Sequence, residues 1–320
     1  MSGSEIFLQQ LIIGLSNGMI VALIALGYTM VYGIIELINF AHGDLFMLGS
    51  FAALTVVGLL GLDQLTAGAP GMWGGLFVML LVVPLFCGGL NWLADRFAYR
   101  HLRESTKLAP LVSAIGLSFV FMNIGLLWGG VPMNVFGLGH SAASPKDFPA
   151  LVSNVNLLGQ SAVEFTEKDL MVFVVTLPLM VLLTWFVKGT RSGKAMRAVA
   201  QDRLAARLMG IPVDRVIGQT FLIGGALAGV ASVVSSVYNN TIYFQMGYRA
   251  GMDAFTAAVL GGIGSLPGAV LGGLVIGLAR ALCDQYLETR WTNVLVFTVL
   301  ILVLVFRPQG LLGARAKEKV

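Results

Sequence analysis

Residues 254–283 read AFTAAVLGGIGSLPGAVLGGLVIGLARALC, an apolar stretch that is too long for one simple membrane crossing. Small and helix-breaking residues interrupt it: Gly261, Gly262, Gly264, Ser265, Pro267 and Gly268. Backbone that leaves the helix at membrane depth is tolerated only where it is buried in protein or lines a cavity. The stretch therefore predicts a membrane protein with a broken or re-entrant segment near 254–268.

The composition of the whole chain also favours a membrane protein. Of its 320 residues, 57% are hydrophobic and only 11% are charged, and the mean hydropathy is +0.85. Soluble domains carry about 25% charged residues. The net charge of +4 comes from short basic blocks between apolar stretches, which is the positive-inside pattern and not a nucleic-acid surface. We expect an all-α integral membrane protein whose residues 1–320 form a single transmembrane domain.

Apolar stretches of membrane-spanning length set the number of helices at about eight. They cover residues 6–31, 44–62, 75–94, 108–128, 169–187, 216–238, 254–283 and 291–306. No basic residue precedes the first stretch, so we interpret it as a retained helix and not as a cleaved signal peptide. A polar interruption near 32–43 predicts a second broken or re-entrant segment. The side on which the N-terminus lies is left open.

Loop charges predict the orientation. Lysines and arginines gather in 95–107, in 188–215 and after residue 306, so these regions should be cytoplasmic. The long loop 129–168 has few basic residues and should be extracytoplasmic. The chain between the last two basic regions must then cross an even number of times. Residues 254–283 can satisfy this condition only by entering and leaving on one side or by crossing twice, and the glycine cluster is where the chain could turn.

Residues 195–209, AMRAVAQDRLAARLM, are good helix formers and predict a helix in the basic loop. Gly210 should end this helix, and Pro212 prevents its continuation. The alternative interpretation is a solvated basic loop that only follows the positive-inside rule.

Two polar features inside the apolar sequence are candidates for a translocation pathway. The first is the group Asn39, His42 and Asp44, for which the alternative is a satisfied loop with Asp44 capping the next helix. The second is the glycine cluster at 261–268, for which the alternative is close helix packing. Arg280 and Asp284, four residues apart, predict a compensated ion pair.

Several chemistries have no motif in this sequence. It contains no G-x-x-x-x-G-K-[ST] phosphate loop, no H-E-x-x-H and no C-x-x-C. Cys87 and Cys283 lie in apolar stretches and should be buried or lipid-facing. We expect no catalytic residues, no metal site and no ATPase site, so the energy for transport must come from a partner or from an ion gradient.

Four segments together resemble the LivH-type permeases of branched-chain amino acid ABC importers, and the resemblance extends over essentially the whole chain. They are ALGYTMVYGIIELINFAHGD at 25–44, AYRHLRESTKLAPLVSAIGLSF at 98–119, AFTAAVLGGIGSLPGAVLGG at 254–273 and FRPQGLLG at 306–313. The segment from Ala205 to Gly210 also resembles the Ala-Ala-x-x-x-Gly core of the coupling motif of ABC permeases. The sequence departs from the family at His101, where a proline is frequent, and at Leu204, where the coupling motif usually begins with Glu.

The resemblance implies a subunit of the bacterial inner membrane that imports leucine, isoleucine or valine. The implied partners are a second, LivM-like permease subunit, two cytoplasmic ATPase subunits and a periplasmic substrate-binding protein. ATP would bind to the partner subunits, so no cofactor is expected on this chain. The implied coupling residues are Arg203, Ala205, Ala206, Arg207 and Gly210.

Three alternatives stay open at this point. A related ABC permease could carry urea, an amide or another amino acid. A stand-alone secondary transporter would need carboxylates in the apolar core to bind a coupling ion, and few are present. A membrane-embedded enzyme would need convergent acids, bases or metal ligands, and only His42 with Asp44 approaches that arrangement.

Overall fold

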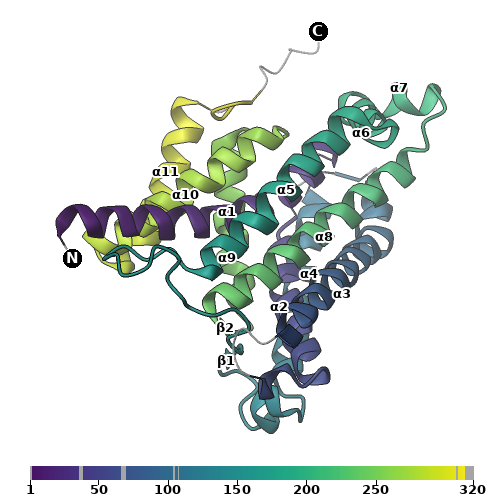
Figure 1. The fold of residues 1–320 in the computed structure, drawn as a ribbon. Coiled ribbons are helices and arrows are strands. Elements are labelled where there is room, and N and C mark those ends of the chain that lie inside the picture. Colours follow the sequence, from purple (N-terminus) through teal and green to yellow (C-terminus); the bar gives the residue numbers. More distant parts are fainter. Residues whose placement is uncertain are drawn as a thin grey trace.

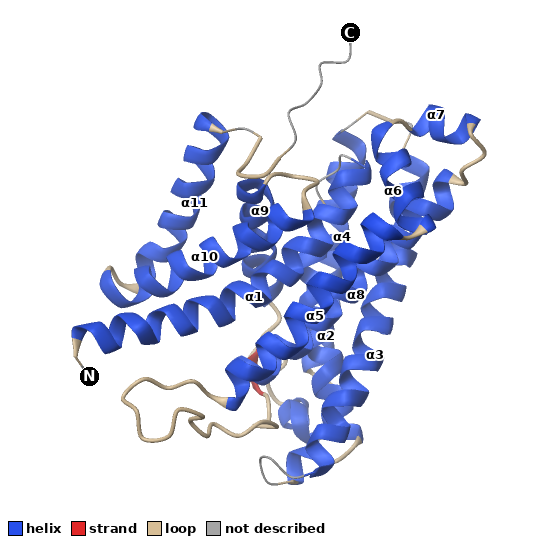
Figure 2. Ribbon diagram, turned by 45° about the horizontal axis from the view of Figure 1, so that its top comes forward, coloured by secondary structure: helices blue, strands red, loops and turns tan. Residues whose placement is uncertain are grey.

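The computed structural model describes residues 2–35, 39–65, 70–103, 105–106, 108–307 and 309–313. Its helices are α1 (Gly3–Ile35), α2 (Ala41–Leu59), α3 (Pro70–Ala94), α4 (Leu108–Gly129), α5 (Glu167–Gly189), α6 (Arg191–Gln201), α7 (Arg203–Leu208), α8 (Val213–Asn239), α9 (Met246–Gly261), α10 (Leu266–Tyr286) and α11 (Thr289–Phe306). The strands β1 (Lys146–Asp147) and β2 (Thr241–Ile242) pair antiparallel. The predicted all-α fold is confirmed (Figures 1 and 2).

Eight helices among the described residues are long and apolar enough to span a membrane. They are α1, α2, α3 with its extension to Leu102, α4, α5, α8, α10 and α11. The predicted number is therefore confirmed. One boundary differs, because residues 95–102 continue α3 through a π-helical turn, Asp95–Tyr99, instead of starting a loop. Asp95 is buried there in an ion pair with Arg103, with 2.5 Å between Oδ1 and Nη2.

The predicted break in 254–283 is present and produces two helices. α9 ends at Gly261 and α10 begins at Leu266. Gly262 and Gly264 between them have φ angles of +103° and +87°, which glycine adopts without a steric cost. Ser265 then caps α10, because its hydroxyl accepts a hydrogen bond from the backbone N–H of Gly268 at 3.2 Å. The chain thus turns back on itself, and α9 and α10 form a hairpin.

Small residues let α10 approach both of its main neighbours. A side-chain carbon added at Gly272 would meet the carbonyl oxygen of Ala257 in α9. One added at Gly273 would meet the backbone of Ala22, and one at Gly277 would meet that of Gly18, both in α1. Close packing by small residues, one of the two interpretations of the glycine pattern, is confirmed.

The helix bundle has two distinct ends. At the first, which we call the basic end, α6 and α7 lie beside the end of α1, because Arg203 donates hydrogen bonds to the carbonyls of Ile34 and Ile35. At the second, the loop end, the long loop between α4 and α5 lies beside the N-terminus. Gln9 and Glu164 exchange hydrogen bonds of 3.2 and 2.7 Å there. The N-terminus, left open by the sequence, therefore shares its end with the long loop.

The chain between the last two basic regions passes along the bundle four times, as α8, α9, α10 and α11. The even number that the charge pattern requires is therefore met by the hairpin of α9 and α10. The predicted break near 32–43 lies between α1 and α2; residues 36–38 fall outside the described part of the chain. Beyond them the chain re-enters the bundle, since the ring of His42 lies against Gly27 of α1.

The loop at 130–166 is packed onto its end of the bundle. Phe136 and Phe148 are buried, and the side chain of Lys146 donates hydrogen bonds to the carbonyls of Phe136 and Ser141 at 3.1 and 2.7 Å. Burial lowers the pKa of the Lys146 ammonium. The pairing of β1 with β2 ties this loop to the end of α8.

Candidate coupling and translocation sites

The predicted single helix at 195–209 is wrong, because the chain forms two helices there. α6 ends at Gln201, and Asp202 has an extended backbone, with φ −157° and ψ 114°. Its carboxylate accepts hydrogen bonds from the backbone N–H groups of Leu204 and Ala205, at 2.8 and 3.0 Å. Aspartate at this position satisfies the free N–H groups of a new helix, and this local preference is stronger than the helix propensity of the flanking residues.

The predicted end of the segment at Gly210 is confirmed. Gly210 has φ +78°, and its N–H donates to the carbonyl of Arg207 at 3.1 Å, while the N–H of Ile211 donates to that of Ala206 at 3.0 Å. A glycine with left-handed backbone just after the last helical turn allows the following N–H groups to pair with carbonyls that would otherwise have no partner.

α7 presents an uncovered surface at the basic end of the bundle, where Figure 1 shows it as the projecting helix. Leu204, Leu208 and Met209 are 68%, 80% and 82% exposed. Ala205 and Arg207 are also exposed, whereas Ala206 is buried. Large apolar side chains that gather on one exposed element mark a surface that another protein covers.

Arg203 joins α7 to the interior of the bundle. Its Nη2 donates hydrogen bonds to the carbonyl oxygens of Ile34, at 3.2 Å, and Ile35, at 2.7 Å. These carbonyls belong to the last two described residues of α1. The guanidinium group therefore links α7 to the end of α1, just before the chain re-enters the bundle at α2.

An ion network holds the extension of α3 to the start of α8. Arg103 bridges Asp95 and Asp214, each at 2.5 Å, and Arg100 also reaches Asp214 at 3.0 Å. A cleft of about 820 Å³ lies beside this network. Its lining includes four arginines, Arg96, Arg100, Arg207 and Arg215. The sequence analysis did not find the two aspartates, because pairing between helices distant in the chain leaves no local pattern.

The predicted polar group at 39–44 lies inside the bundle. Asn39 and His42 are buried; the Tyr99 hydroxyl donates to Oδ1 of Asn39 at 2.8 Å, and the His42 ring stands edge-on to Tyr28 with 5.3 Å between centroids. Among the described residues, neither nitrogen of His42 has a hydrogen-bond partner.

The alternative role of Asp44, as the cap of the next helix, is wrong. α2 begins at Ala41, no side chain caps it, and Asp44 already lies in its first turn. Its carboxylate instead accepts a hydrogen bond from the hydroxyl of Ser118 in α4.

The glycine cluster at 261–268 lies at the basic end, away from His42. The carbonyls of Leu260 and Gly261 accept hydrogen bonds from the N–H groups of Leu311 and Leu312, at 2.8 and 2.9 Å. The segment after α11 thus forms hydrogen bonds with carbonyls that the break would otherwise leave exposed.

The same break adjoins the end of α1 and the coupling segment. Gly264 lies against Gly33 of α1. A small cavity of about 80 Å³ is lined by both glycines and by Met196 and Ala200 of α6. The break, the end of α1 and the helices α6 and α7 therefore meet in one place.

A further site at the loop end was not found by sequence reasoning. A cavity of about 450 Å³ lies among α1, α2, α8, α9 and α10, and Ile20, Ile24 and Phe46 are in its lining. Arg280 pairs there with Asp253 of α9, with 2.5 Å between Nη2 and Oδ1. The predicted pair of Arg280 with Asp284 is wrong, since the carboxylate of Asp284 accepts from the hydroxyl of Thr292.

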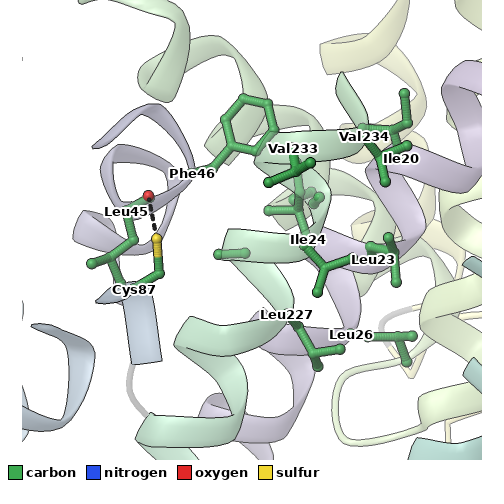
Figure 3. Packing of buried hydrophobic residues seen from close by; sticks show 14 of the residues in the cluster. Ile20, Leu23, Ile24, Leu26, Leu45, Phe46, Cys87, Leu227, Val233 and Val234 are labelled. Carbon is green, nitrogen blue, oxygen red and sulfur yellow. Dashed lines mark hydrogen bonds between the residues drawn. The ribbon is translucent and has the colours of Figure 1, made fainter. Parts of the chain in front are cut away.

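Both cysteines are buried and unpaired, as predicted. Cys87 donates a weak hydrogen bond to the carbonyl of Leu45 at 3.5 Å (Figure 3). They take no part in either candidate site.

Residues 10–304 match the family described as branched-chain amino acid transport system, permease component. The chain is 41% identical to the high-affinity branched-chain amino acid transport system permease protein LivH of Escherichia coli strain K12, over 98% of each chain. It is 42% identical to the corresponding protein BraD of Pseudomonas aeruginosa, also over 98% of each chain. Among solved structures, PsaBC from Streptococcus pneumoniae in complex with Fab gives a TM-score of 0.47 at 15% identity, covering 95% of this chain and 92% of the other.

Proposed function

Since the chain belongs to the family of branched-chain amino acid transport permease components, we propose that it forms part of the translocation pathway of an ATP-driven importer for leucine, isoleucine and valine. It is a multi-pass protein of the inner membrane. The relatives named above supply the substrate class, because LivH and BraD are both permease proteins of branched-chain amino acid systems.

One observation carries the mechanism: Arg203 ties α7 to the last carbonyls of α1. α7 has an exposed apolar surface, which a motor subunit can bind. A movement of α7 would pull on Ile34 and Ile35, next to the break at Gly264 and to the re-entry of the chain at Asn39. Packed helices move as rigid bodies with two discrete arrangements and are not continuously deformable, so the bundle would switch between outward- and inward-facing states.

The coupling surface consists of Arg203, Ala205, Ala206, Arg207 and Gly210. In this proposal Ala206 packs α7 onto the bundle, Gly210 ends it, and Arg207 faces the motor. ATP binds and is hydrolysed on two partner ATPase subunits at the basic end, which is cytoplasmic. This chain carries out no chemical step.

The two predicted pathway groups take different roles. Asn39, His42 and Asp44 form the constriction inside the bundle, where the His42 nitrogens have no hydrogen-bond partner in the described part of the chain. The second group acts as the hinge between α9 and α10 and not as a binding surface, because the N–H groups of Leu311 and Leu312 already occupy the carbonyls of Leu260 and Gly261. This group consists of Gly261, Gly262, Gly264, Ser265, Pro267 and Gly268.

The remaining partners follow from the same assignment. A second, LivM-like permease subunit completes the pathway, and a periplasmic substrate-binding protein docks at the loop end, where the folded loop 130–166 offers a surface. The loop end is then extracytoplasmic.

Uptake in cells tests the substrate class. A strain that lacks its own branched-chain amino acid importers receives this chain with its partner subunits and takes up labelled leucine, isoleucine, valine or urea. We expect uptake of the three branched-chain amino acids that requires this chain. Uptake of urea alone, or of none of the four by a complex that assembles, would contradict the proposal.

A further inference from the structure

We propose that Asp253 and Arg280 form a recognition site for the zwitterionic backbone of an amino acid in the cavity at the loop end, with the branched side chain against Ile20, Ile24 and Phe46. This inference rests on the proposed function, because it specifies how the same pathway would recognise its substrate.

The position of this ion pair is the first argument. Arg280 lies in the last two turns of α10 and Asp253 in the middle of α9, and their side chains are only 12% and 9% exposed. Ionisable side chains within membrane-spanning segments are costly and usually mark a substrate or ion pathway. The small remaining exposure faces the cavity, since both residues line it.

The second argument is that the pair keeps unused hydrogen-bonding capacity. Arg280 uses Nη2 for both of its hydrogen bonds, to Asp253 at 2.5 Å and to Asn293 of α11 at 3.2 Å. Its Nε is buried and has no partner among the described residues. A guanidinium group can donate five hydrogen bonds in a fork that matches a carboxylate. Asp253 can in turn accept from an ammonium group.

Charge balance gives the third argument. Four ionisable side chains line the cavity: Arg249, Asp253, Arg280 and Asp284. Two are cationic and two anionic, so the formal charge of the lining is zero. A net anion or a net cation would gain little from such a lining, whereas a neutral molecule with separated charges finds a partner for each of them.

The apolar part of the lining completes the match. The apolar residues of the lining include Ile13, Ile20, Val21, Ile24, Phe46 and Met246. Binding sites for small molecules combine such apolar walls with a few convergent polar groups. An aliphatic side chain fits this wall better than the side chain of a polar amino acid.

The test uses the complete importer in proteoliposomes with its binding protein outside and ATP inside. The double variant Asp253→Asn with Arg280→Gln removes both charges and leaves no unpaired ion. We expect leucine uptake to fall about tenfold or more, while ATP hydrolysis stimulated by the binding protein stays within about twofold of wild type. The matched control is Glu288→Gln with Arg290→Gln, which neutralises the exposed ion pair between α10 and α11 and should leave both activities unchanged.

Uptake by the double variant at the wild-type rate would overturn the proposal. If the double variant does not assemble, the charge swap Asp253→Arg with Arg280→Asp decides: wild-type uptake by the swap would show a structural pair and overturn the proposal.

A measurement that keeps both charges gives an independent answer. Ala250→Cys places a thiol in the half-buried wall of the cavity, and Cys87 and Cys283 are buried. Millimolar leucine should slow the reaction of this thiol with a water-soluble maleimide at least threefold, and leucinamide, which lacks the carboxylate, should not. Equal labelling rates with and without leucine would overturn the proposal. A wild-type importer that carries no leucine would instead refute the proposed function itself.

Discussion

In the proposed mechanism, the connection between motor and pathway depends on Arg203. Leu204, Ala205, Arg207 and Leu208 on α7 are exposed, whereas the guanidinium group of Arg203 reaches back to the carbonyls of Ile34 and Ile35. Hydrogen bonds that involve a charged group contribute about 1.5–3 kcal/mol. Two of them on the end of α1 are sufficient to make α7 and α1 move together.

Removing this side chain should uncouple the importer. We predict that Arg203→Ala lowers leucine uptake about tenfold while the complex still hydrolyses ATP. The motor subunit would still bind α7, but the movement of α7 would no longer reach α1. The control is Arg191→Ala, which changes an exposed arginine at the start of α6. Uptake and ATP hydrolysis measured on the same preparation check this. A parallel loss of both activities would argue against a coupling role for Arg203.

Gly210 tests the end of the coupling segment. It has φ +78° and donates its N–H to Arg207, and proline can satisfy neither condition. We predict that Gly210→Pro abolishes uptake but leaves the protein inserted in the membrane. Asparagine tolerates left-handed backbone, so Gly210→Asn should retain most of the activity. Normal uptake by the proline variant would remove this turn from the mechanism.

Single residues were predictable where the requirement is local. The glycine at the end of α7 and the burial of both cysteines follow from the neighbouring sequence. The partners of Asp44, Asp253 and Arg280 did not follow, because each pairs with a helix that is distant in the chain. The Arg280–Asp284 prediction was wrong for that reason: the i,i+4 rule considers one helix, whereas Asp253 of α9 lies closer.

At the scale of elements, the contact between α1 and α10 organises the bundle. Gly14 and Gly18 of α1 meet Gly273 and Gly277 of α10 so closely that added side chains would meet backbone atoms. Without a hydrophobic driving force between helices in lipid, such packing supplies much of their association. The same contact fixes the position of α1 relative to the break before α10.

A paired substitution measures this packing. Gly273→Val would place a branched side chain against Ala22 of α1, whereas Gly89→Val adds the same atoms on α3 where no atom lies within 4 Å of the new carbon. Overpacking costs about 1–3 kcal/mol, so we predict a lower unfolding temperature for Gly273→Val than for Gly89→Val. The loss of tryptophan fluorescence or of monodispersity on heating in detergent provides the measurement. Equal unfolding temperatures would contradict the assigned packing.

Element boundaries show what periodicity misses. The break between α9 and α10 was predictable, since glycines have low helix propensity and Pro267 is favoured in the first turn of a new helix. The division between α6 and α7 was not predicted, although Asp202 carries the signal: an N-capping residue within a run of helix formers. The extension of α3 to Leu102 depends on the buried ion pair between Asp95 and Arg103. Arg103 was instead expected in a loop, because residues 95–107 are rich in basic side chains.

At the scale of the whole molecule, the orientation follows from charge. The basic blocks and the coupling segment share one end, and the N-terminus shares the other with the long loop. The sequence predicted this separation and the even number of passes. It did not predict the cavity at the loop end, because five helices from distant parts of the chain line it.

Labelling from outside intact spheroplasts tests the orientation. We predict that a membrane-impermeant maleimide reacts with Leu158→Cys in the long loop and not with Leu208→Cys on α7; both positions are exposed, at 54% and 80%. Leu208→Cys should react only after the membrane is permeabilised. The buried native cysteines give no background. Labelling of Leu208→Cys in intact spheroplasts would invert the bundle and remove α7 from the reach of a cytoplasmic motor.

The central claim is that this chain imports branched-chain amino acids only when a motor subunit acts on it. Leucine uptake into proteoliposomes, with the complete complex or with this chain alone, tests it most directly. Accumulation should require the complete complex and ATP on the motor side, and the chain alone should accumulate none. Accumulation of leucine by the chain alone, without ATP, would contradict the account and identify a self-sufficient transporter.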